Sequence, residues 1–455
     1  MFAGETSSRT ARALFTLGLL VVSIPGTTQI AVRNQGYIPY SGAPIYYRSD
    51  DISDAVTLLQ RRLDAGDAQL NHRAGKHGYL RSVLELLDIS AASQTLVFSK
   101  TSFQYPKISP EHPRALYFND DVYVGVVNDG KEIEVISFDK QQGAIFFILH
   151  EQQVEKPRFE RAELDCTQCH IASGTRGVPG VLLRSVRPSV TGAPVPGAKH
   201  FNTDQNSPLE ERWGGWYATG SIAERTIANL VAPRGSSGAT PALAPVAQRF
   251  DPAAYLASGS DEVALLVLAH QTQMHNLIAL TNYKTRIALH AASQQPGAAA
   301  GRELTEEERQ QFERPAEELL RYLLFAGEAA LPQLDGKVIA QASQFAQEFQ
   351  RRGPRDSQGR SLRDFDLNTR LFTYPCSYLI YSDAFDALPE PSKSYVYGRL
   401  LEVLSGRDES QDFQKLSAGD RRAILEVLLQ TKSGLPPEWH DFARNNLVMN
   451  RRESK

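Results

Sequence analysis

Two cysteines and a histidine stand together in the sequence Cys166-Thr167-Gln168-Cys169-His170. C-x-x-C-H is the spacing at which c-type haem is attached. Two thiols three residues apart on a helical turn can both form thioethers with the vinyl groups of one porphyrin, and the adjoining imidazole can then bind the iron. The sequence therefore predicts one covalent haem c, attached at Cys166 and Cys169, with His170 as the proximal iron ligand.

Other uses of this pattern explain the sequence less well. With 3 cysteines and 10 histidines in 455 residues, the pattern would arise by chance on the order of a few times in ten thousand. A structural zinc site takes four nitrogen or sulfur ligands, usually as two close pairs, and the second pair is missing. A thioredoxin-type dithiol belongs in a βαβ unit with a helix directly after the pair, whereas Gly174, Gly177, Pro179 and Gly180 follow here. The third cysteine, Cys376, lies in an apolar run and is expected to be a buried free thiol.

The ligand on the second side of the iron would decide much of the function. A strong sixth ligand favours electron transfer, while an open position lets a small molecule bind the iron. The candidates are His270, Met274 and His275 in one helical segment, with His200 as a further possibility. His270 and Met274 share a helix face and His275 points about 140° away from His270, so only one side of this helix can meet the iron. For each residue, a place on the polar face or in the core is the alternative. Met449 lies too near the C-terminus to be favoured.

Aromatic and basic residues after the pentapeptide could complete a haem pocket. The run Trp213-Gly214-Gly215-Trp216-Tyr217 holds two of the three tryptophans. Such rings could wall a porphyrin, and Arg212 or an indole N–H could hold a propionate. The side chains of Arg176, Arg184 and Arg187 could neutralise propionates as well. Core packing for the aromatic residues and a solvated edge for the arginines are the alternatives.

The N-terminus has the order of a secretory signal. Arg9 and Arg12 precede an apolar run over 14–24, and Pro25-Gly26 follows. We expect residues 1–27 to be a signal peptide and the protein to be periplasmic; an uncleaved signal that anchors the chain is the alternative. The run is too short for hydrocarbon about 30 Å thick, and no later segment is expected to form a stable membrane span. A net charge of −3 makes nucleic acid a poor partner.

Hydrophobic periodicity divides the rest of the chain. Helical spacing over 55–63 and 79–87 indicates two short amphipathic helices. Short β-branched and aromatic runs follow at 96–98, 115–118, 122–127, 133–135 and 144–149. The turn sequences Asn128-Asp129-Gly130 and Gln141-Gln142-Gly143 favour tight hairpins, so these runs predict an antiparallel meander.

Beyond the meander the pattern changes twice. Residues 160–255 are rich in Gly and Pro, and 231–251 read as a surface loop. Helical spacing returns over 258–289 and again at 396–404 and 424–429. Thr305 with Glu308 forms a capping box, and Pro315 is expected to divide that helix in two.

Together these patterns predict an α+β fold that is mainly α. The expected parts are the signal peptide 1–27, an N-terminal α+β domain 28–159 with an antiparallel sheet, a haem-attachment segment 160–256, and a helical domain 257–455.

Cys166, Cys169 and His170 after an export signal resemble the cytochrome c superfamily. In small cytochromes c the site lies near the start of a domain of about one hundred residues and a loop methionine is the sixth ligand, and this chain departs from both habits. Segments 177–180, 207–217 and 270–276 resemble large single-haem bacterial cytochrome proteins, over roughly a third of the chain. The resemblance implies a haem pocket built from both halves of the chain and implies no substrate.

Two functions are carried forward from the sequence. The first is a periplasmic c-type cytochrome that transfers single electrons to a redox partner protein. The second is a haem-dependent oxidoreductase with an open iron site for a small molecule, favoured by a chain several times longer than a one-electron carrier needs. A haem-based sensing module is a third class. No catalytic residue and no oligomeric state can be read from the sequence.

Overall fold

The structure is a computed structural model that describes residues 38–75, 77–246, 250–295 and 302–446. The predicted signal peptide 1–27 and Met449 lie outside the described residues. Ile38–Lys455 form one compact unit, so both predicted domain borders, after residues 159 and 256, fall inside it.

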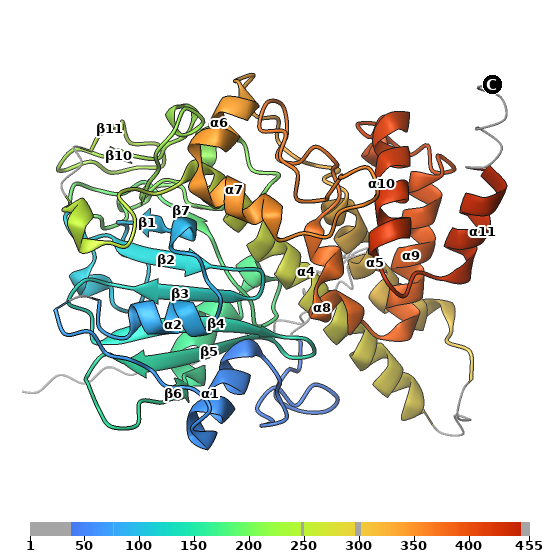
Figure 1. The fold of residues 1–455 in the computed structure, drawn as a ribbon, viewed down its shortest axis with the longest axis horizontal. Coiled ribbons are helices and arrows are strands. Elements are labelled where there is room, and N and C mark those ends of the chain that lie inside the picture. The colour runs from blue at the N-terminus through green and yellow to red at the C-terminus, as the bar shows by residue number, and fades with distance from the viewer. Residues whose placement is uncertain (1–37, 76, 247–249, 296–301, 447–455) are drawn as a thin grey trace, which may run out of the picture. The chain divides into compact units, whose positions relative to one another are not determined.

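A seven-stranded antiparallel sheet forms the N-terminal part of the fold (Figure 1). Its strand order is β6-β5-β4-β3-β2-β1-β9. The strands are β1 (Thr95–Val97), β2 (Arg114–Phe118), β3 (Val122–Val126), β4 (Glu132–Asp139), β5 (Gly143–His150), β6 (Phe159–Arg161) and β9 (Trp216–Tyr217). The predicted meander is confirmed, because β1 to β5 match the five apolar runs and consecutive strands pair as hairpins. The two edge strands β6 and β9 were not predicted.

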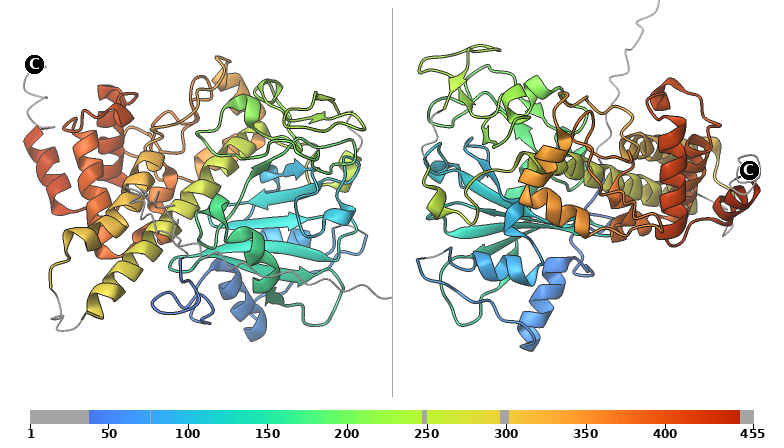
Figure 2. Two further views of the ribbon diagram at one scale, coloured as in Figure 1. Left: turned by 180° about the vertical axis from the view of Figure 1, so that it is seen from behind. Right: turned by 45° about the horizontal axis from the view of Figure 1, so that its top comes forward.

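The two faces of the sheet carry different helices (Figures 1 and 2). The helices α1 (Ala55–Ala65) and α2 (Leu80–Leu86) cover one face, where Val124 and Val135 share their core. On the other face, Phe118, Tyr123 and Phe146 belong to the larger core that contains α4 (Glu262–Ser293). Both early helices were predicted. The alternation of side chains along each strand thus supplies two cores from one sheet.

The helix α4 runs from the sheet to the C-terminal helices (Figures 1 and 2). Asp261 caps its N-terminus by accepting from the N–H groups of Val263 and Ala264, at 2.8 and 3.0 Å. In the described part of the chain, α4 is the one helix long and apolar enough to cross a membrane, although no later span was expected. Of its most apolar window, 94% is buried inside the protein, so core packing accounts for its composition.

The C-terminal part is helical, as predicted, and the fold is α+β. Its helices are α5 (Glu306–Leu323), α6 (Gly336–Ala342), α7 (Gln344–Arg351), α8 (Asp383–Asp386), α9 (Glu390–Leu404), α10 (Ala418–Thr431) and α11 (Pro437–Asn446). The capping box of Thr305 and Glu308 is present. The prediction that Pro315 divides α5 is wrong, since α5 continues through it. Pro315 is buried and its carbonyl accepts from Thr281 on α4, so packing against α4 offsets the lost backbone hydrogen bond.

The segment between sheet and α4 has little regular structure. It holds α3 (Glu163–His170) and two small strand pairs, β7 (Arg184–Ser185) with β8 (Phe201–Asn202) and β10 (Leu230–Val231) with β11 (Ala244–Pro245). Most described residues over 232–246 are exposed, as expected of a surface loop. Single 3-10 turns cover Ala91–Ser93, Tyr105–Lys107, Ser173–Thr175, Leu209–Glu211, Ala223–Arg225, Pro252–Ala254, Tyr378–Tyr381 and Gln411–Phe413.

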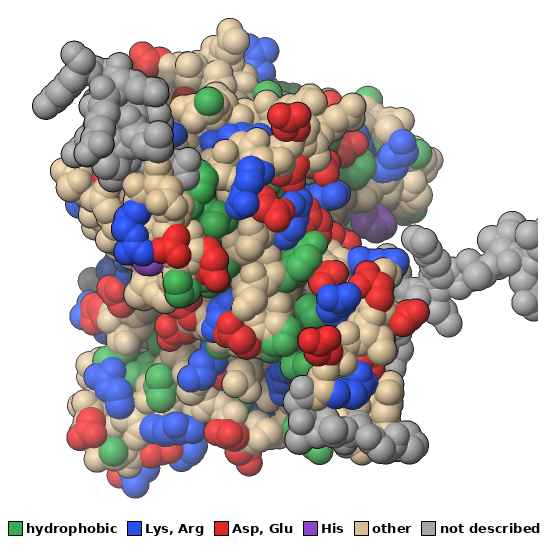
Figure 3. Space-filling view, turned by 90° about the vertical axis from the view of Figure 1, so that its right-hand side faces the viewer, with side chains coloured by type: hydrophobic (Ala, Val, Ile, Leu, Met, Phe, Trp, Pro, Cys, Tyr) green, Lys and Arg blue, Asp and Glu red, His purple; other side chains and the backbone are tan. Residues whose placement is uncertain are grey.

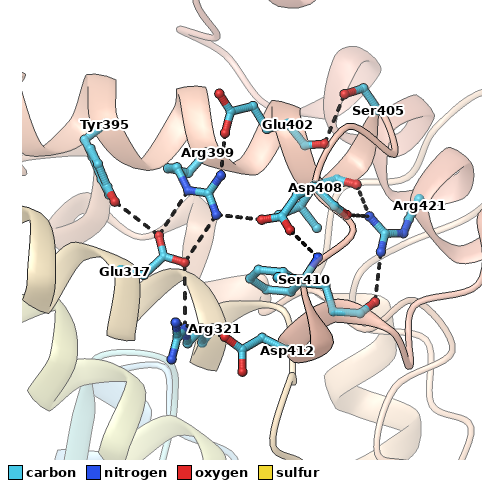
Figure 4. Close-up of polar contacts among 12 residues, drawn as sticks. Glu317, Arg321, Tyr395, Arg399, Glu402, Ser405, Asp408, Ser410, Asp412 and Arg421 are labelled. Atoms are coloured by element: carbon cyan, nitrogen blue, oxygen red, sulfur yellow. Dashed lines mark hydrogen bonds and ion pairs between the residues drawn. The ribbon is translucent and has the colours of Figure 1, made fainter.

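Ion pairs hold the C-terminal helices together (Figure 4). Arg399 on α9 contacts Glu317 on α5 at 3.2 Å and Asp408 at 2.6 Å, and it also pairs with Glu402. Burial alone would raise the pKa of Asp408, but hydrogen bonds from Ser410 and Arg399 outweigh it and lower that pKa. On the surface that these helices present, basic and acidic side chains are interspersed (Figure 3).

Replacing Arg399 with methionine should lower the free energy of unfolding by about 1–3 kcal/mol, because three partly buried carboxylates lose their partner. Asp408 has a lowered pKa in the native state, so its contribution is present above about pH 4 and is lost as the pH falls through the native pKa. Denaturant unfolding at pH 7 and below pH 4 measures both effects. The control is Arg309→Met, which removes an exposed pair with Glu306 and should change stability by about 0.5 kcal/mol or less. Equal losses in both variants would contradict a stabilising role for the network.

Candidate functional site

The helix α3 presents the three predicted residues to one cavity. Cys166, Cys169 and His170 all line it. They stand at positions i, i+3 and i+4 of the helix and therefore share one face. Cys166 is half-buried and Cys169 is exposed. The backbone just before α3 is fixed to the sheet, since the Ala162 N–H donates to the Phe146 carbonyl at 2.9 Å. The structure thus brings together the two thiols and the imidazole that the sequence singled out.

The imidazole of His170 is held in one tautomer. Its Nδ1 lies 2.8 Å from the carbonyl oxygen of Gly180. A carbonyl can only accept, so Nδ1 carries the proton and the lone pair is on Nε2. Burial lowers the pKa of His170, although the hydrogen bond to Gly180 opposes this. A neutral imidazole with its Nε2 lone pair available is the form that binds a metal ion.

The Gly180 carbonyl is fixed from both sides. On α4, the side chain of Asn276 accepts from the Val181 N–H at 3.0 Å and donates to the Val181 carbonyl at 2.9 Å. On β5, the Ala144 N–H donates to the Pro179 carbonyl at 3.2 Å. A Cβ on Gly180 would lie 2.1 Å from Asn276 Oδ1, so only glycine permits this approach. The sheet and α4 together therefore set the orientation of His170.

The cavity lies between the sheet and α4. Its empty volume is about 1270 Å³, which includes the open solvent at its mouth. Its walls beyond α3 include Leu116, Gly125, Ile136, Phe146 and Ile148 from the sheet, the segment 181–184, Trp216, and Leu268 and Thr272 from α4, together with the charged side chains of Arg114, Glu134 and Arg184. The ring centroid of Phe146 is 5.0 Å from that of His170. Most of the wall is apolar, which suits a flat hydrophobic cofactor with a few charged substituents.

Two of the candidate sixth ligands lie on the other side of α4. His270 and Met274 are both about 200° around the helix from Thr272, and neither lines the cavity. Both ring nitrogens of His270 are used: Nδ1–H donates to Gln205 Oε1 at 2.5 Å, and Nε2 accepts from the Ser377 hydroxyl at 2.7 Å. Met274 is fully buried in the core.

His275 lies nearer the cavity but behind its wall. It is about 60° around α4 from Thr272, and its ring stacks on Phe138 with centroids 4.0 Å apart. The Tyr123 hydroxyl accepts from the Gln271 amide at 2.9 Å and is hydrogen-bonded to Nδ1 of His275 at 3.0 Å. Nε2 of His275 is buried and has no hydrogen-bond partner among the described residues.

Among the histidines and methionines of the described chain, His170 alone lines the cavity. His200 is exposed at the surface and is not part of the wall. The structure therefore does not place any of the candidate sixth ligands beside His170.

The aromatic and basic residues predicted for the haem pocket also divide into those that line the cavity and those that do not. Trp216 lines the cavity, with its indole N–H donating to the Arg184 carbonyl at 2.7 Å, whereas Trp213 is fully buried in the core. Arg184 lines the cavity and Arg187 does not. Two more arginines are engaged elsewhere. Arg176 pairs with Glu318 at 2.6 Å, and Arg212 donates to the carbonyls of Ser207 and Gln205 at 2.7 and 2.8 Å.

Several residues of the site were not found in the sequence. Arg114 and Glu134 are charged residues on the cavity face of β2 and β4, and Asn276 positions Gly180 from α4. A charged side chain at an inward position of an otherwise apolar strand is the signal that could have found the first two. No sequence pattern indicates that Asn276 contacts the backbone of Val181.

Two further findings bear on the alternatives. Within the described residues, no group of three or more His, Cys, Asp or Glu side chains could hold a metal ion. Cys166 is the fourth and Cys169 the seventh residue of α3, which lies beside an antiparallel sheet. A thioredoxin-type pair would instead belong in a βαβ unit. Cys376 is fully buried, as predicted, and burial raises the pKa of its thiol.

Comparisons with protein-family models, with curated proteins and with solved structures found no significant match.

The buried histidines of α4 should make the fold sensitive to acid. Burial lowers the pKa of His270 and of His275 to about 3, against about 6.5 in the unfolded chain. The unfolded state binds protons that the native state does not, so stability is full above pH 6.5 and falls as the pH drops toward 3, by on the order of 2 kcal/mol per histidine at pH 5.

Denaturant unfolding between pH 7.5 and pH 5 tests this. His270→Gln should reduce the loss of stability between pH 7.5 and pH 5 by on the order of 2 kcal/mol, while His150→Gln, with a half-exposed side chain, should leave that loss unchanged. An unaltered slope in His270→Gln would show that the acid sensitivity comes from other groups.

Proposed function

We propose that this chain is an exported c-type cytochrome with one covalent haem attached at Cys166 and Cys169, with His170 as an axial ligand. The observation that carries the proposal is that Cys166, Cys169 and a histidine held in its Nδ1–H tautomer all line one mostly apolar cavity. The residues present fit the group: two thiols at thioether spacing, a metal-binding tautomer, a mostly apolar wall and two arginines for carboxylate substituents. Bound there, a haem would supply a one-electron redox couple.

The residues of the cavity have separate roles in this proposal. The Gly180 carbonyl keeps the proton of His170 on Nδ1 and raises the basicity of Nε2. Phe146, Ile148, Leu268 and Trp216 exclude water from the cavity, which favours the less charged redox state. The half-exposed edge of α3, where Cys169 reaches the surface, gives a redox partner protein in the periplasm a short approach. Single-electron transfer is therefore the function that we favour.

A second function is favoured by one specific observation. Among the described residues, the cavity wall offers no histidine or methionine except His170. A sixth position without a protein ligand would admit a small molecule, which is the requirement of a haem-dependent oxidoreductase. Thr272, Arg114 and Arg184 are among the polar side chains of the wall that such a molecule would meet.

Protein produced in an exporting, cytochrome-maturing host should keep its haem colour after denaturation and acid extraction. The double variant Cys166→Ala/Cys169→Ala should lose covalent haem completely, since no thioether can form. Cys376→Ala is the control and should retain it, because that thiol is buried in the core. Staining for haem on a denaturing gel, with titration of free sulfhydryls, reads out both results. A colourless wild-type chain with both thiols titratable would end the proposal.

The second function, which requires an open sixth position, predicts a change in the absorption spectrum when carbon monoxide is added to the reduced protein. His275→Ala serves as the matched variant, because His275 is the candidate nearest the cavity. The same response to carbon monoxide in both proteins is expected. Spectra typical of six-coordinate iron in both redox states, with no response to carbon monoxide, would instead support an electron carrier alone. Loss of the six-coordinate form in His275→Ala would then identify His275 as the ligand.

A further inference from the structure

The most unusual feature of the cavity wall is an ion pair that crosses a strand. Arg114 on β2 reaches over β3 to Glu134 on β4. It passes above Gly125, which lies opposite Glu134 in the strand register. A Cβ on Gly125 would be 2.2 Å from a terminal nitrogen of Arg114 and 2.6 Å from its Cζ. Because Gly125 in the middle of β3 has no side chain, Arg114 can occupy the space above it.

Glu134 fixes one end of this arginine and is itself saturated. Its carboxylate accepts from the Ser102 hydroxyl at 3.0 Å and from the Gln104 amide at 2.8 Å, in addition to Arg114. Since no further donor is needed, the carboxylate acts as an anchor. The guanidinium is therefore held in one orientation before any ligand arrives, which reduces the entropy cost of binding.

The remaining donors of Arg114 make no hydrogen bond within the described part of the chain. A guanidinium has five N–H donors, and the hydrogen bonds of Arg114 in the described structure run from one terminal nitrogen to Glu134. Its Nε is buried and has no hydrogen-bond partner among the described residues. A buried charged donor without an acceptor is costly. The other terminal nitrogen makes no hydrogen bond to the described residues, and it is the donor that we assign to an acceptor in the cavity, which Arg114 lines.

The charged side chains of this wall do not cancel. Arg184 lines the same cavity as Arg114 and Glu134, from the 181–184 segment. Two arginines against one saturated carboxylate leave the cavity with a net positive charge. This is the electrostatic setting of a site for an anion.

We propose that Arg114, oriented by Glu134 and assisted by Arg184, binds an anionic oxygen group inside the cavity. The chemistry is that of a carboxylate or small oxyanion on a guanidinium fork. The group has two possible sources: a propionate of the haem itself, or a free small anion that enters beside it. The inference rests on the proposed function in one respect, since the haem of that proposal is one of the two sources. The geometry of Arg114 and Glu134 is observed in the chain itself.

The test uses the holoprotein and separates the two sources. The variants are Arg114→Lys, which keeps the charge and loses the fork, the neutral pair Arg114→Gln/Glu134→Gln, and Gly125→Ala, which displaces Arg114 without removing it. The controls are Arg158→Gln, from an exposed pair with Asp64, and Gly398→Ala, where an added Cβ meets nothing within 4 Å. Haem content on a denaturing gel is measured first, so that failed attachment is recognised as failure of the proposed function.

Two measurements follow on the oxidised protein. Spectral titration with azide and formate gives the affinity for free anions, and imidazole is the neutral probe. If the source is a free anion, Arg114→Lys and Gly125→Ala should weaken azide and formate about ten- to hundredfold and leave imidazole unchanged. If the source is a propionate, anion affinity should stay within about twofold, while the midpoint potential falls and its dependence on pH changes in the same variants.

Either pattern supports the site and names its ligand. Variants that match wild type in anion affinity, in midpoint potential and in its pH dependence would overturn the inference, even with haem fully attached. Equal weakening of imidazole and azide would overturn it too, since that result indicates a collapsed cavity.

Discussion

The hydrogen bond from His170 to the Gly180 carbonyl is the constraint on which the site depends. It decides which ring nitrogen faces the cavity, and it needs a carbonyl that does not move. That carbonyl is held by Asn276 of α4 and, through Pro179, by β5. An imidazole in the middle of the sequence is thus oriented by a sheet that precedes it and by a helix that follows it. This explains why the attachment segment has so little regular structure of its own: its order comes from its neighbours.

The polar side chains of α4 give this helix a unique placement. His270 contacts Gln205 and Ser377 on one side, while Gln271 and Asn276 reach Tyr123 and Val181 on others. Each of these bonds is buried, so a rotation of α4 by one position would leave several donors and acceptors without partners. A helix of mostly apolar composition could slide along its neighbours with little loss. The buried polar groups prevent this, and they fix which face, Leu268 and Thr272, meets the cavity.

The sequence predicted those features that depend on local pattern. The strands β1 to β5 alternate or run apolar between turn sequences, and the spacing of the pentapeptide is that of three residues on one helix face, which line one cavity. Features that depend on distant partners were missed. The strand β9 exists because two residues of a Gly-rich segment pair with β1, and Pro315 is tolerated because α4 packs against it. The face of α4 could not be chosen in advance, since His270, Met274 and His275 are equally plausible ligands until the partners of the helix are known. Arg114 and Glu134 are unremarkable until the register places Gly125 between them.

The order in which the cavity walls are made has a consequence for maturation of the protein. The meander consists of neighbouring hairpins and can form early, because its contacts are local in sequence. The wall supplied by α4 is synthesised later than α3, and it packs only when the chain has passed through the long Gly- and Pro-rich stretch. Before that moment the cavity lacks the wall that Leu268 and Thr272 supply. On the proposed function, a cofactor attached at this stage would become enclosed when α4 docks, so the rate of docking would set how long the half-built cavity stays open.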